Sequence, residues 1–312
     1  MIQKLDCVFT IDGNFIQHFT VACTSLLETN REIIGRVMIV HDMDFNKQLN
    51  KSFKYFLNKY NLNIESYKLQ SDTLSKYKTS HHITKAAYFR LLLSEILPAN
   101  VNRVLYLDSD LVINGSLSYI NDIEFNKKSS IDKCKTGEGK KSFQYVDSDE
   151  YFFYATDHGY NAHDLARLDF ANYKSEKYFN SGVMLINLKK WRASSVSEQL
   201  INIADKYNDH LTWWDQDILN IAFQNSWGEL SYAYNAFCTT EKNGEKYKII
   251  HYTGPSKPWH LMNRHPYKYL YWKYLRMTPF KYYFPIYSTF RKSIASLMPQ
   301  QFRDFVKGMI KK

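Results

Sequence analysis

The sequence predicts an α/β protein whose mostly parallel, mixed sheet is flanked by helices. Apolar runs suited to strands alternate with helical patterns as far as residue 107, and such alternation is typical of parallel sheets. The run Val104–Leu107 is short, rich in strand-forming residues and bounded by the turn signals Pro98–Asn100 and Asp108–Asp110, which predicts a buried central strand. A hydrophobic content of 45% in 312 residues is sufficient for a substantial core.

Three strand and helix pairs are expected around the central strand. Short apolar runs that end in polar residues predict strands at residues 7–11, 36–41 and 63–67. Apolar side chains at helical spacing predict a helix after each of these strands, the third over residues 84–97. This third helix carries Arg90, which is placed to reach a phosphate or an internal acid.

The second half of the chain is less regular. Residues 126–150 are polar, contain glycine and have few large apolar side chains, which indicates a surface excursion rather than a domain boundary. Further strands are predicted at residues 183–186 and 248–252. Asp157 follows a run of aromatic residues and is expected at a strand end, and a helix is predicted to start near Asp215.

The net charge of +10 is concentrated at the C-terminal end of the chain. Residues 263–312 contain 11 Lys and Arg residues and one acid, whereas residues 1–262 contain 30 basic and 30 acidic residues. The neutral main body argues against a nucleic-acid surface. None of the four cysteines forms a CxxC pair, so free thiols in a reducing compartment are expected. We expect neither a signal peptide nor a membrane-spanning helix, because no run of about 18 apolar residues occurs.

Asp108 and Asp110 directly follow the central strand. Ligands bind beyond the carboxyl ends of strands in such sheets, and two carboxylates on one strand end suit a divalent cation that can hold a diphosphate. Two other interpretations remain open at this point. The acids can belong to an ordinary polar turn, or they can serve a phosphohydrolase of the haloacid dehalogenase type, with Asp108 as nucleophile and Asp110 as general acid.

Polar residues also stand next to two other predicted strands. Asp12, Gly13 and Asn14 can contact a nucleoside or form an ordinary turn before the first helix. Asn180–Gly182 precedes the strand at 183–186, and its glycine allows the backbone to approach a ligand closely.

Two later segments carry further candidates. Gln216 lies between two acids at a predicted helix start, where acids favour the helix dipole but capping requires no amide. His251 ends a predicted strand and is either a third metal ligand or a structural histidine. Gly254 and Lys257 follow in a turn that suits a phosphate.

Together, five segments in this order resemble family 8 of the retaining glycosyltransferases: Phe9–Asn14, Leu107–Asp110, Tyr178–Gly182, Asp215–Asp217 and His251–Trp259. The resemblance covers roughly residues 5–275. The chain is similar to bacterial lipopolysaccharide and lipooligosaccharide glucosyl- and galactosyltransferases, whose C-terminal extension resembles Tyr267–Pro279. The resemblance implies an A-type, Rossmann-like glycosyltransferase fold, a UDP-glucose or UDP-galactose donor, and a divalent ion, Mn²⁺ or alternatively Mg²⁺.

The resemblance also implies a role for each matching residue. The metal ligands would be Asp108, Asp110 and His251. Gln216 and Asp215 would be the catalytic pair beside the donor sugar, where same-face attack by the acceptor hydroxyl is favoured over a covalent intermediate on Asp215 or Asp217. The donor-binding residues would be Thr10, Asp12 and Asn14 at the uridine end, Gly254 and Lys257 at the diphosphate, and Arg90, Asp108, Ser109, Asn180, Gly182 and His251.

Two features depart from the family pattern. Gly13 stands where relatives usually carry an acidic residue, so the contact with the base is expected to differ. The excursion at 126–150 is longer than the family's usual loop and lies where acceptor contacts are expected, which leaves the acceptor open.

The expected domains are a nucleotide-sugar-binding catalytic domain, residues 1–262, and a basic aromatic and amphipathic extension, residues 263–312. Apolar residues between 286 and 310 recur at helical spacing among Lys and Arg residues, which predicts an element lying in the plane of a membrane. A helix that packs on the catalytic domain or pairs two chains is the alternative. We therefore expect a cytoplasmic enzyme, peripheral on the inner face of the bacterial inner membrane, which meets a UDP-hexose and a lipid-linked or oligosaccharide acceptor.

Two other functions explain less of the sequence. A phosphohydrolase would need a later acidic motif, but Asp205 and Asp209 lie on an amphipathic helix instead. A non-catalytic, membrane-bound sugar-nucleotide binding protein leaves the metal-ligand set and Gln216 unexplained.

Overall fold

The computed structural model describes residues 4–44, 46–69, 85–126, 150–237 and 247–283 of the chain. Two features predicted from the sequence fall outside these residues. They are the excursion at 126–150, of which only residues 126 and 150 are described, and the amphipathic tail beyond residue 283. Asn126 and Glu150 form an isolated antiparallel bridge, so the two ends of the excursion lie side by side.

The main sheet contains seven strands in the order β3-β2-β1-β4-β7-β6-β8. The pairs from β3 to β4 are parallel, β7 is antiparallel to β4 and to β6, and β6 is parallel to β8. The predicted mostly parallel, mixed sheet is therefore confirmed. The strands are β1 (Leu5–Ile11), β2 (Ile34–His41), β3 (Ile64–Lys68), β4 (Arg103–Leu107), β6 (Phe153–Asp157), β7 (Phe179–Asn187) and β8 (Gly228–Glu229).

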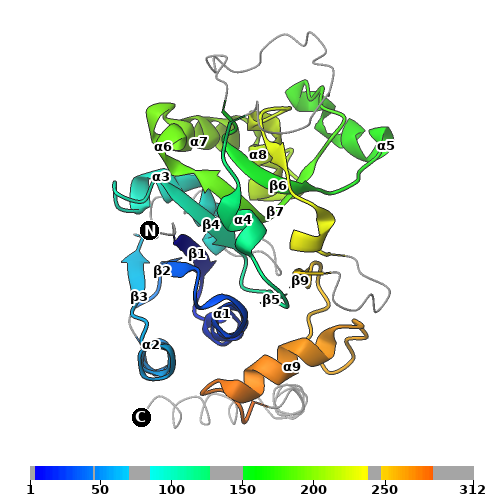
Figure 1. Ribbon diagram of the computed structural model, residues 1–312. Helices are drawn as coiled ribbons and strands as arrows, with labels where there is room; N and C mark the ends of the chain where they lie inside the picture. Colours follow the sequence, from blue (N-terminus) through cyan, green and yellow to red (C-terminus); the bar gives the residue numbers. More distant parts are fainter. Residues whose placement is uncertain (1–3, 45, 70–84, 127–149, 238–246, 284–312) are drawn as a thin grey trace, which may run out of the picture.

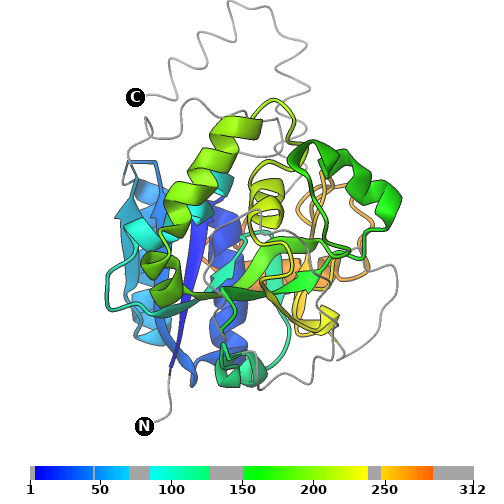
Figure 2. The ribbon, with the colours of Figure 1, turned by 90° about the horizontal axis from the view of Figure 1, so that it is seen from above.

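Helices cover both faces of this sheet, with α6 and α7 on one face and α1 and α2 on the other (Figure 1). Seen from above, α7 lies across the sheet (Figure 2). The helices are α1 (Ile16–Asn30), α2 (Lys47–Tyr60), η2 (Lys85–Leu92), α3 (Leu93–Ile96), α4 (Ser118–Asp122), α5 (Ala162–Leu165), η4 (Ala166–Ala171), α6 (Leu188–Ala193), α7 (Val196–Tyr207), α8 (Trp214–Ala222), η5 (Tyr232–Tyr234) and α9 (Lys268–Met277).

The two hydrophobic layers follow from the side-chain period of a strand. Successive residues of β1 point to opposite faces, and Val8 packs in the layer with α6, α7 and α8. Cys7 and Phe9 pack in the layer with α1 and α2. All three side chains are fully buried, so the strand is apolar on both faces, as expected for a covered parallel sheet.

Three predicted elements differ in detail from those observed. The segment expected to be a helix over 84–97 is a 3₁₀ helix, η2, followed by the short α3. Residues 88–94 are buried in succession, so packing on all sides sets this backbone instead of one amphipathic stripe. The strand expected at 183–186 begins earlier, at Phe179, and runs antiparallel to β4. The strand expected at 248–252 is β9 (Ile249–His251), which pairs with β5 (Leu111–Ile113) in a separate two-stranded sheet.

The first described part of the segment beyond residue 262 packs on the body that carries the main sheet. In Figure 1, α9 lies beside α1, and Tyr271 of α9 shares a hydrophobic cluster with Val21 of α1. His18 of α1 stacks on Trp259 with ring centroids 3.5 Å apart and bonds to the Tyr271 hydroxyl at 2.8 Å. This apolar site lowers the pKa of His18 to about 3, chiefly through burial, so the ring stays neutral and packs as part of the core.

Candidate active site

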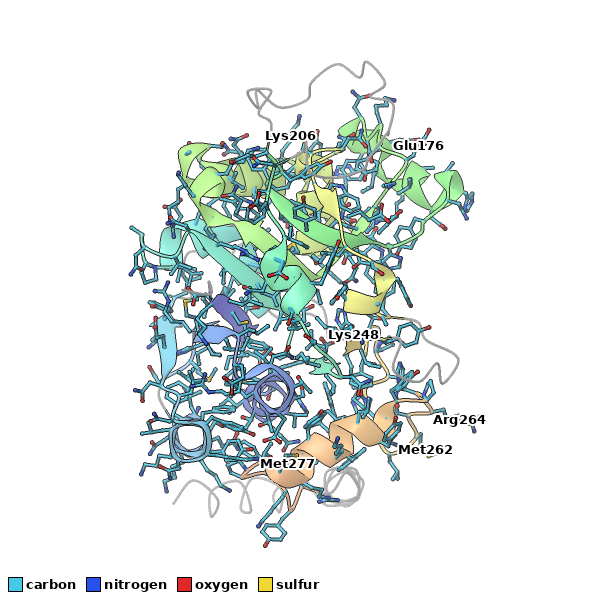
Figure 3. All side chains as sticks on the ribbon, viewed as in Figure 1. Glu176, Lys206, Lys248, Met262, Arg264 and Met277 are labelled. Carbon is cyan, nitrogen blue, oxygen red and sulfur yellow. The ribbon has the colours of Figure 1, made fainter. Side chains whose placement is uncertain are left out.

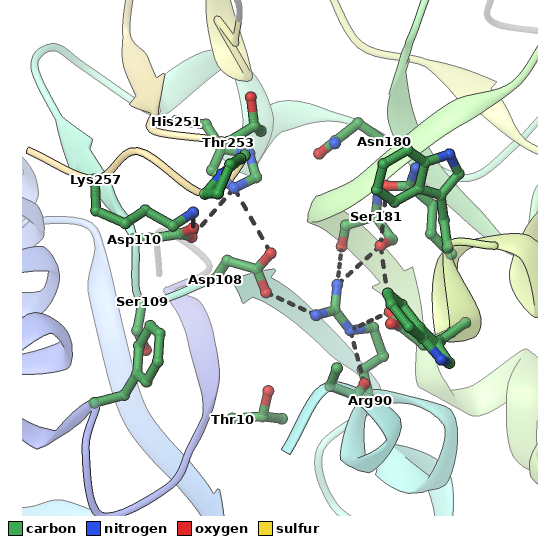
Figure 4. Close-up of a pocket in the computed structure, with 18 of the residues that line it drawn as sticks. Thr10, Arg90, Asp108, Ser109, Asp110, Asn180, Ser181, His251, Thr253 and Lys257 are labelled. Carbon is green, nitrogen blue, oxygen red and sulfur yellow. Dashed lines mark hydrogen bonds and ion pairs between the residues drawn. The ribbon is translucent and has the colours of Figure 1, made fainter. Parts of the chain in front are cut away.

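A cleft of about 510 Å³ opens where β1 and β4 end (Figure 4). Because β7 is antiparallel to β4, its first residues reach the same place, and the Asp108 amide donates to the Gly182 carbonyl at 2.8 Å. All residues predicted for the site line this cleft except Asn14 and Gly182. The lining residues are Thr10, Ile11, Asp12, Phe15, Ala87, Arg90, Asp108, Ser109, Asp110, His158, Tyr160, Asn180, Ser181, Trp213, Trp214, Asp215, Gln216, His251, Thr253, Gly254, Pro255 and Lys257.

Asp108, Asp110 and His251 form a cluster at the centre of the cleft. The pairing of β5 with β9 sets Leu111 opposite His251, which brings the imidazole to the two acids that precede Leu111. The His251 Nε2 atom lies 3.2 Å from Asp110 Oδ1 and 3.7 Å from Asp108 Oδ2. One ligand atom from each of the three residues lies within 4.8 Å of the others. Two carboxylates and one imidazole at this spacing can bind a single divalent ion, and this donor set suits Mn²⁺.

Gly182 lies against this cluster from the β7 side. A Cβ atom on Gly182 would stand 2.2 Å from His251 Cε1 and 2.8 Å from Asp108 Oδ2. Any side chain here would therefore displace two of the three candidate metal ligands. The absence of a side chain at Gly182 thus makes room for this cluster, and its predicted contact with the donor stays a prediction.

Lys257 completes the cluster on the side of the C-terminal loop. Its Nζ atom lies 2.6 Å from Asp110 Oδ2 and donates to the Tyr252 carbonyl at 2.7 Å. Burial alone would raise the pKa of Asp110, but Lys257 and His251 outweigh burial and hold this pKa well below its usual range. Asp110 is therefore a carboxylate, the form that binds a cation. The loop turns at Gly254, whose φ of +79° favours glycine.

Arg90 is a buried cation that connects three elements of the cleft. Its NH2 group lies 2.9 Å from Asp108 Oδ1, and its Nε lies 3.0 Å from Asp215 Oδ2. Its NH1 group donates to the carbonyl and the hydroxyl of Ser181, both at 2.9 Å (Figure 4). Burial would lower the pKa of Arg90, but the two acids raise it. Arg90 thus pairs with internal acids and connects η2 with the end of β4, with β7 and with α8.

Asp215 is a buried carboxyl group in the cleft, next to Arg90. Burial raises its pKa to about 6; Arg90 opposes this shift, and Asp108 adds to it. At neutral pH a largely ionised carboxylate therefore faces the cleft beside a guanidinium. Its negative charge is available to stabilise positive charge that develops on a bound ligand.

Asp217, in contrast, is fully buried and does not line the cleft. It forms an ion pair with Arg167 at 2.7 Å and accepts the Tyr178 hydroxyl at 2.6 Å. The backbone amides of Thr212 and Trp213 donate to it at 2.9 and 2.8 Å. These bonds use the lone pairs of both carboxylate oxygens, so Asp217 anchors the start of α8 and is poorly placed to act as a nucleophile.

The Gln216 side chain bridges α8 and β7. Its Oε1 atom accepts the Ser181 amide at 3.0 Å, and its Nε2 donates to the Tyr178 hydroxyl at 3.2 Å. The Tyr178 hydroxyl also donates to Asp217. Asp217 therefore helps to orient the Gln216 side-chain amide through Tyr178. Gln216 therefore faces the cleft in one orientation, next to Asp215.

Of the residues predicted to contact uridine, two form a turn before α1. Asp12 Oδ1 accepts the Asn14 amide at 2.7 Å, so these residues also form a turn before α1, and Asn14 lies outside the cleft. Thr10 bonds to the Tyr106 hydroxyl at 2.9 Å, which in turn donates to Asp108 at 2.6 Å. The Ser109 hydroxyl is buried and lacks a hydrogen-bond partner in the structure.

Several lining residues were not among the sequence candidates. His158 and Tyr160 follow β6 with ring centroids 4.0 Å apart, and Trp213 is 44% exposed at the mouth of the cleft. Trp214 has a φ of +35°, in the left-handed region, a conformation that is often found at functional sites. Trp213 and Trp214 directly precede the Asp215–Asp217 motif, but no spacing rule distinguishes them from core aromatic residues.

A comparison with known families and proteins agrees with the motif resemblance. The model of glycosyl transferase family 8 matches residues 6–263. The lipopolysaccharide 1,2-glucosyltransferase of Escherichia coli strain K12 is 25% identical over 272 residues, covering 83% of this chain and 73% of that protein. The lipopolysaccharide 1,3-galactosyltransferase of Salmonella typhimurium strain LT2 is 25% identical over 279 residues, covering 85% and 75%.

A solved structure supports the fold. The crystal structure of the galactosyltransferase LgtC in complex with donor and acceptor sugar analogues superposes with a TM-score of 0.72 at 20% identity, covering 88% of this chain and 96% of that chain. The fold predicted from the motifs, the A-type glycosyltransferase fold, is thereby confirmed, and the phosphohydrolase interpretation loses its basis. With more than three quarters of its length matched by the family model, this chain belongs to glycosyl transferase family 8.

Proposed function

We propose that this glycosyltransferase moves a hexose, glucose or galactose, from a UDP-sugar to a lipopolysaccharide, lipooligosaccharide or related surface glycan, with retention of the anomeric configuration. The observation that carries the proposal is the Asp108, Asp110 and His251 cluster, which shares one cleft with Lys257. The names of the two curated relatives, both lipopolysaccharide hexosyltransferases, support the choice of sugar class and acceptor.

The residues present fit a divalent ion. Asp108, Asp110 and His251 would hold Mn²⁺, with Mg²⁺ as the alternative, and the missing side chain at Gly182 leaves the ligands room to approach one another. When bound, the ion supplies positive charge that offsets the charge developing on the departing UDP. Lys257 would add its own charge to the diphosphate, because its ammonium already lies beside Asp110.

The donor would lie along the cleft. Thr10 and Asp12 line the cleft and would contact the uridine end, and Ser109 would contribute at the end of β4. Asn14 lies outside the cleft and would act there through its turn with Asp12. Gly254 lies in the loop that would hold the diphosphate. The donor sugar would lie among Arg90, Asn180, Asp215 and Gln216. All four line the cleft, and the last three lie near the starts of β7 and α8.

Transfer would proceed by attack of the acceptor hydroxyl on the face from which UDP departs. An oxocarbenium-like centre would form as the sugar-phosphate bond breaks, and Asp215, which lines the cleft, would supply negative charge to stabilise it. Asp217 is saturated by hydrogen bonds, and Asp215 is paired with Arg90. Both observations favour same-face attack over a covalent intermediate on either acid.

A screen of UDP-sugars for metal-dependent UDP release tests this proposal, with and without candidate acceptor glycans. We expect release with UDP-glucose or UDP-galactose, faster when an acceptor is present. Saturable donor binding without any UDP release would support the non-catalytic alternative. Release of inorganic phosphate instead of UDP would support a phosphohydrolase.

The proposed site of action is the cytoplasmic face of the bacterial inner membrane, with residues 263–312 as the membrane-associating part. No helix among the described residues is long and apolar enough to cross a bilayer. Residues 255–283 contain no acid, and their exposed side chains include Leu261, Met262, Tyr269 and Tyr282. Figure 3 shows Met262 and Arg264 projecting at one end of α9, with Met277 at the other. Basic and aromatic side chains together suit an anionic membrane surface.

Deleting residues 284–312 should strongly weaken binding to anionic liposomes, and high salt should weaken binding of the intact chain. Each basic residue near an anionic leaflet contributes roughly 1 kcal/mol, and this tail contains six of them. The cut leaves Phe280 and Tyr283 in place, which pack on the body of the protein. Co-sedimentation measures binding, and donor hydrolysis should survive.

Charge reversal of Lys174, Lys189 and Lys206 serves as the control. Lys206 lies at the opposite end of the molecule from α9 (Figure 3), so this variant should bind liposomes like the intact chain. If the truncated protein sediments with liposomes as fully as the intact chain does, or unfolds, the tail is structural and its proposed membrane role is wrong.

A further inference from the structure

We infer that Asn235 is a positioning residue that fixes both the metal-facing nitrogen of His251 and the ligand-facing atom of Asn180. The inference rests on the proposed metal and donor sites. Asn235 is fully buried and belongs to none of the sequence motifs. Its Nδ2 donates to Asn180 Oδ1 at 2.9 Å, and its Oδ1 lies 2.9 Å from His251 Nδ1.

The direction of this hydrogen-bond chain is set by a backbone amide. The Gly182 N–H donates to Asn180 at 3.0 Å, so the atom that accepts it must be the Asn180 oxygen. The Asn235 atom facing that oxygen must then be its NH₂ group, and its other atom, the oxygen, faces His251. An oxygen without a proton requires His251 Nδ1 to donate. The chain has no second orientation, because a backbone N–H cannot accept.

The consequence for His251 is a defined tautomer. With the proton on Nδ1, the Nε2 atom carries a free lone pair, and Nε2 is the atom that faces Asp108 and Asp110. Metal-binding histidines generally depend on a partner at the other ring nitrogen, and loss of that partner costs about 10- to 100-fold in metal affinity. Asn235 occupies this place with a neutral amide.

The consequence for Asn180 is a fixed orientation of its side-chain amide. Its oxygen accepts from both Gly182 and Asn235, so its NH₂ group is the part able to serve a ligand in the cleft that Asn180 lines. A donating group there suits a sugar hydroxyl or phosphate oxygen. One buried amide thus orients a metal ligand on β9 and a donor-sugar contact on β7.

Backbone pairing holds Asn235 in the required place. Ala236 bridges Ile250 in parallel register, and the His251 amide donates to the Ala236 carbonyl at 3.0 Å. The residue before Ala236 is therefore held next to His251, whatever the rest of the loop does. A side chain with one donor and one acceptor is needed at this position, since either bond alone leaves a buried polar atom unsatisfied.

Asn235→Ala and Asn235→Asp separate the two roles. In Asn235→Ala both bonds are lost, so Mn²⁺ affinity, measured with the metal alone by electron paramagnetic resonance or calorimetry, should fall about 10- to 100-fold. Asn235→Asp keeps an acceptor for His251 and should bind Mn²⁺ close to wild type. Its second oxygen opposes the Asn180 oxygen, so the donor KM should rise by about tenfold, as expected for a buried polar mismatch.

Asn30→Ala is the matched control. Asn30 is also a buried amide, bonded to the Gly115 carbonyl and the Leu117 amide, but it lies outside the cleft. It should lose stability without losing Mn²⁺ affinity. If Asn235→Ala fails to fold, Asn235→Asp, which preserves the shape of the side chain, still tests the inference through its predicted rise in donor KM.

Comparison with Asp110→Asn distinguishes the failure of this inference from failure of the metal site. If Asp110→Asn loses Mn²⁺ while Asn235→Ala binds like wild type, the positioning role is refuted. The same holds if both Asn235 variants weaken Mn²⁺ equally, or if Asn235→Asp leaves the donor KM unchanged. If Asp110→Asn itself still binds Mn²⁺, the metal site is misplaced and the inference falls with it.

Discussion

Replacing Asp110 with Asn should abolish Mn²⁺ binding and lower turnover by about a thousandfold or more, while the fold remains intact. Asp110 is the candidate ligand closest to His251, and an amide offers the ion one neutral oxygen instead of a carboxylate. The ion supplies several kcal/mol of charge stabilisation when bound, and each 1.36 kcal/mol corresponds to a factor of ten in rate. Asn has nearly the same shape, and Lys257 keeps its bond to the Tyr252 carbonyl, so the loop should stay in place.

The measurements are turnover with saturating UDP-hexose, Mn²⁺ affinity and the rise of Tm on adding Mn²⁺, which reports binding to the folded state. Asp6→Asn is the control, because Asp6 also pairs with a basic residue, Arg36, at 2.6 Å but lies away from the cleft. It should keep both turnover and the metal-induced rise. Full activity of Asp110→Asn in a chelator would show that no metal acts through this residue.

The strand tips of the site could be predicted because local sequence determines them. β1 and β4 are apolar on both faces, and polar residues follow where each strand ends. Parallel neighbours end at the same edge of a sheet, so Asp12 and Asp108 were expected to share one region. The candidate metal ligands could also be located from the sequence, because Asp108 and Asp110 follow a recognisable strand and His251 ends another.

What the sequence did not reveal depends on pairings between distant segments. The contact of His251 with Asp110 was expected only from the family resemblance, because it requires β9 to pair with β5 outside the main sheet, and no local pattern specifies this partner. Asn235 reaches the site only through the bridge between Ala236 and Ile250. Its neighbours in sequence are alanine and aromatic residues, which mark no site, so the burial and the hydrogen bonds of Asn235 became visible only in the folded chain.

The role of Arg90 illustrates a second limit. Its position in an apolar segment was clear from the sequence, but two destinations were open, a phosphate or an internal acid. The structure pairs it with Asp108 and Asp215. A buried guanidinium requires such partners because unpaired charge is costly inside a protein. Asp108 follows β4 and Asp215 lies on α8, and no local pattern around Arg90 specifies that these two segments meet it.

Replacing Gln216 with Ala should reduce turnover by about ten- to a thousandfold and change the donor KM little. This is the range for loss of one preorganised contact with the transition state. Gln216 faces the cleft beside Asp215, and Tyr178 and Ser181 hold its amide in one orientation. A group oriented before the substrate arrives contributes most where charge develops during reaction, at the sugar, and least to general donor affinity.

The substitution also has a structural cost that must be separated from its catalytic effect. It leaves the Ser181 amide without its acceptor, a loss of about 1–3 kcal/mol in stability for a buried group, so Tm should be measured beside the kinetics. Gln224→Ala is the matched control: Gln224 follows the same helix and accepts the Lys174 amide, but it does not line the cleft. It should lose some stability and keep its turnover. A raised donor KM with normal turnover in Gln216→Ala would place this residue in donor binding instead of at the reacting sugar.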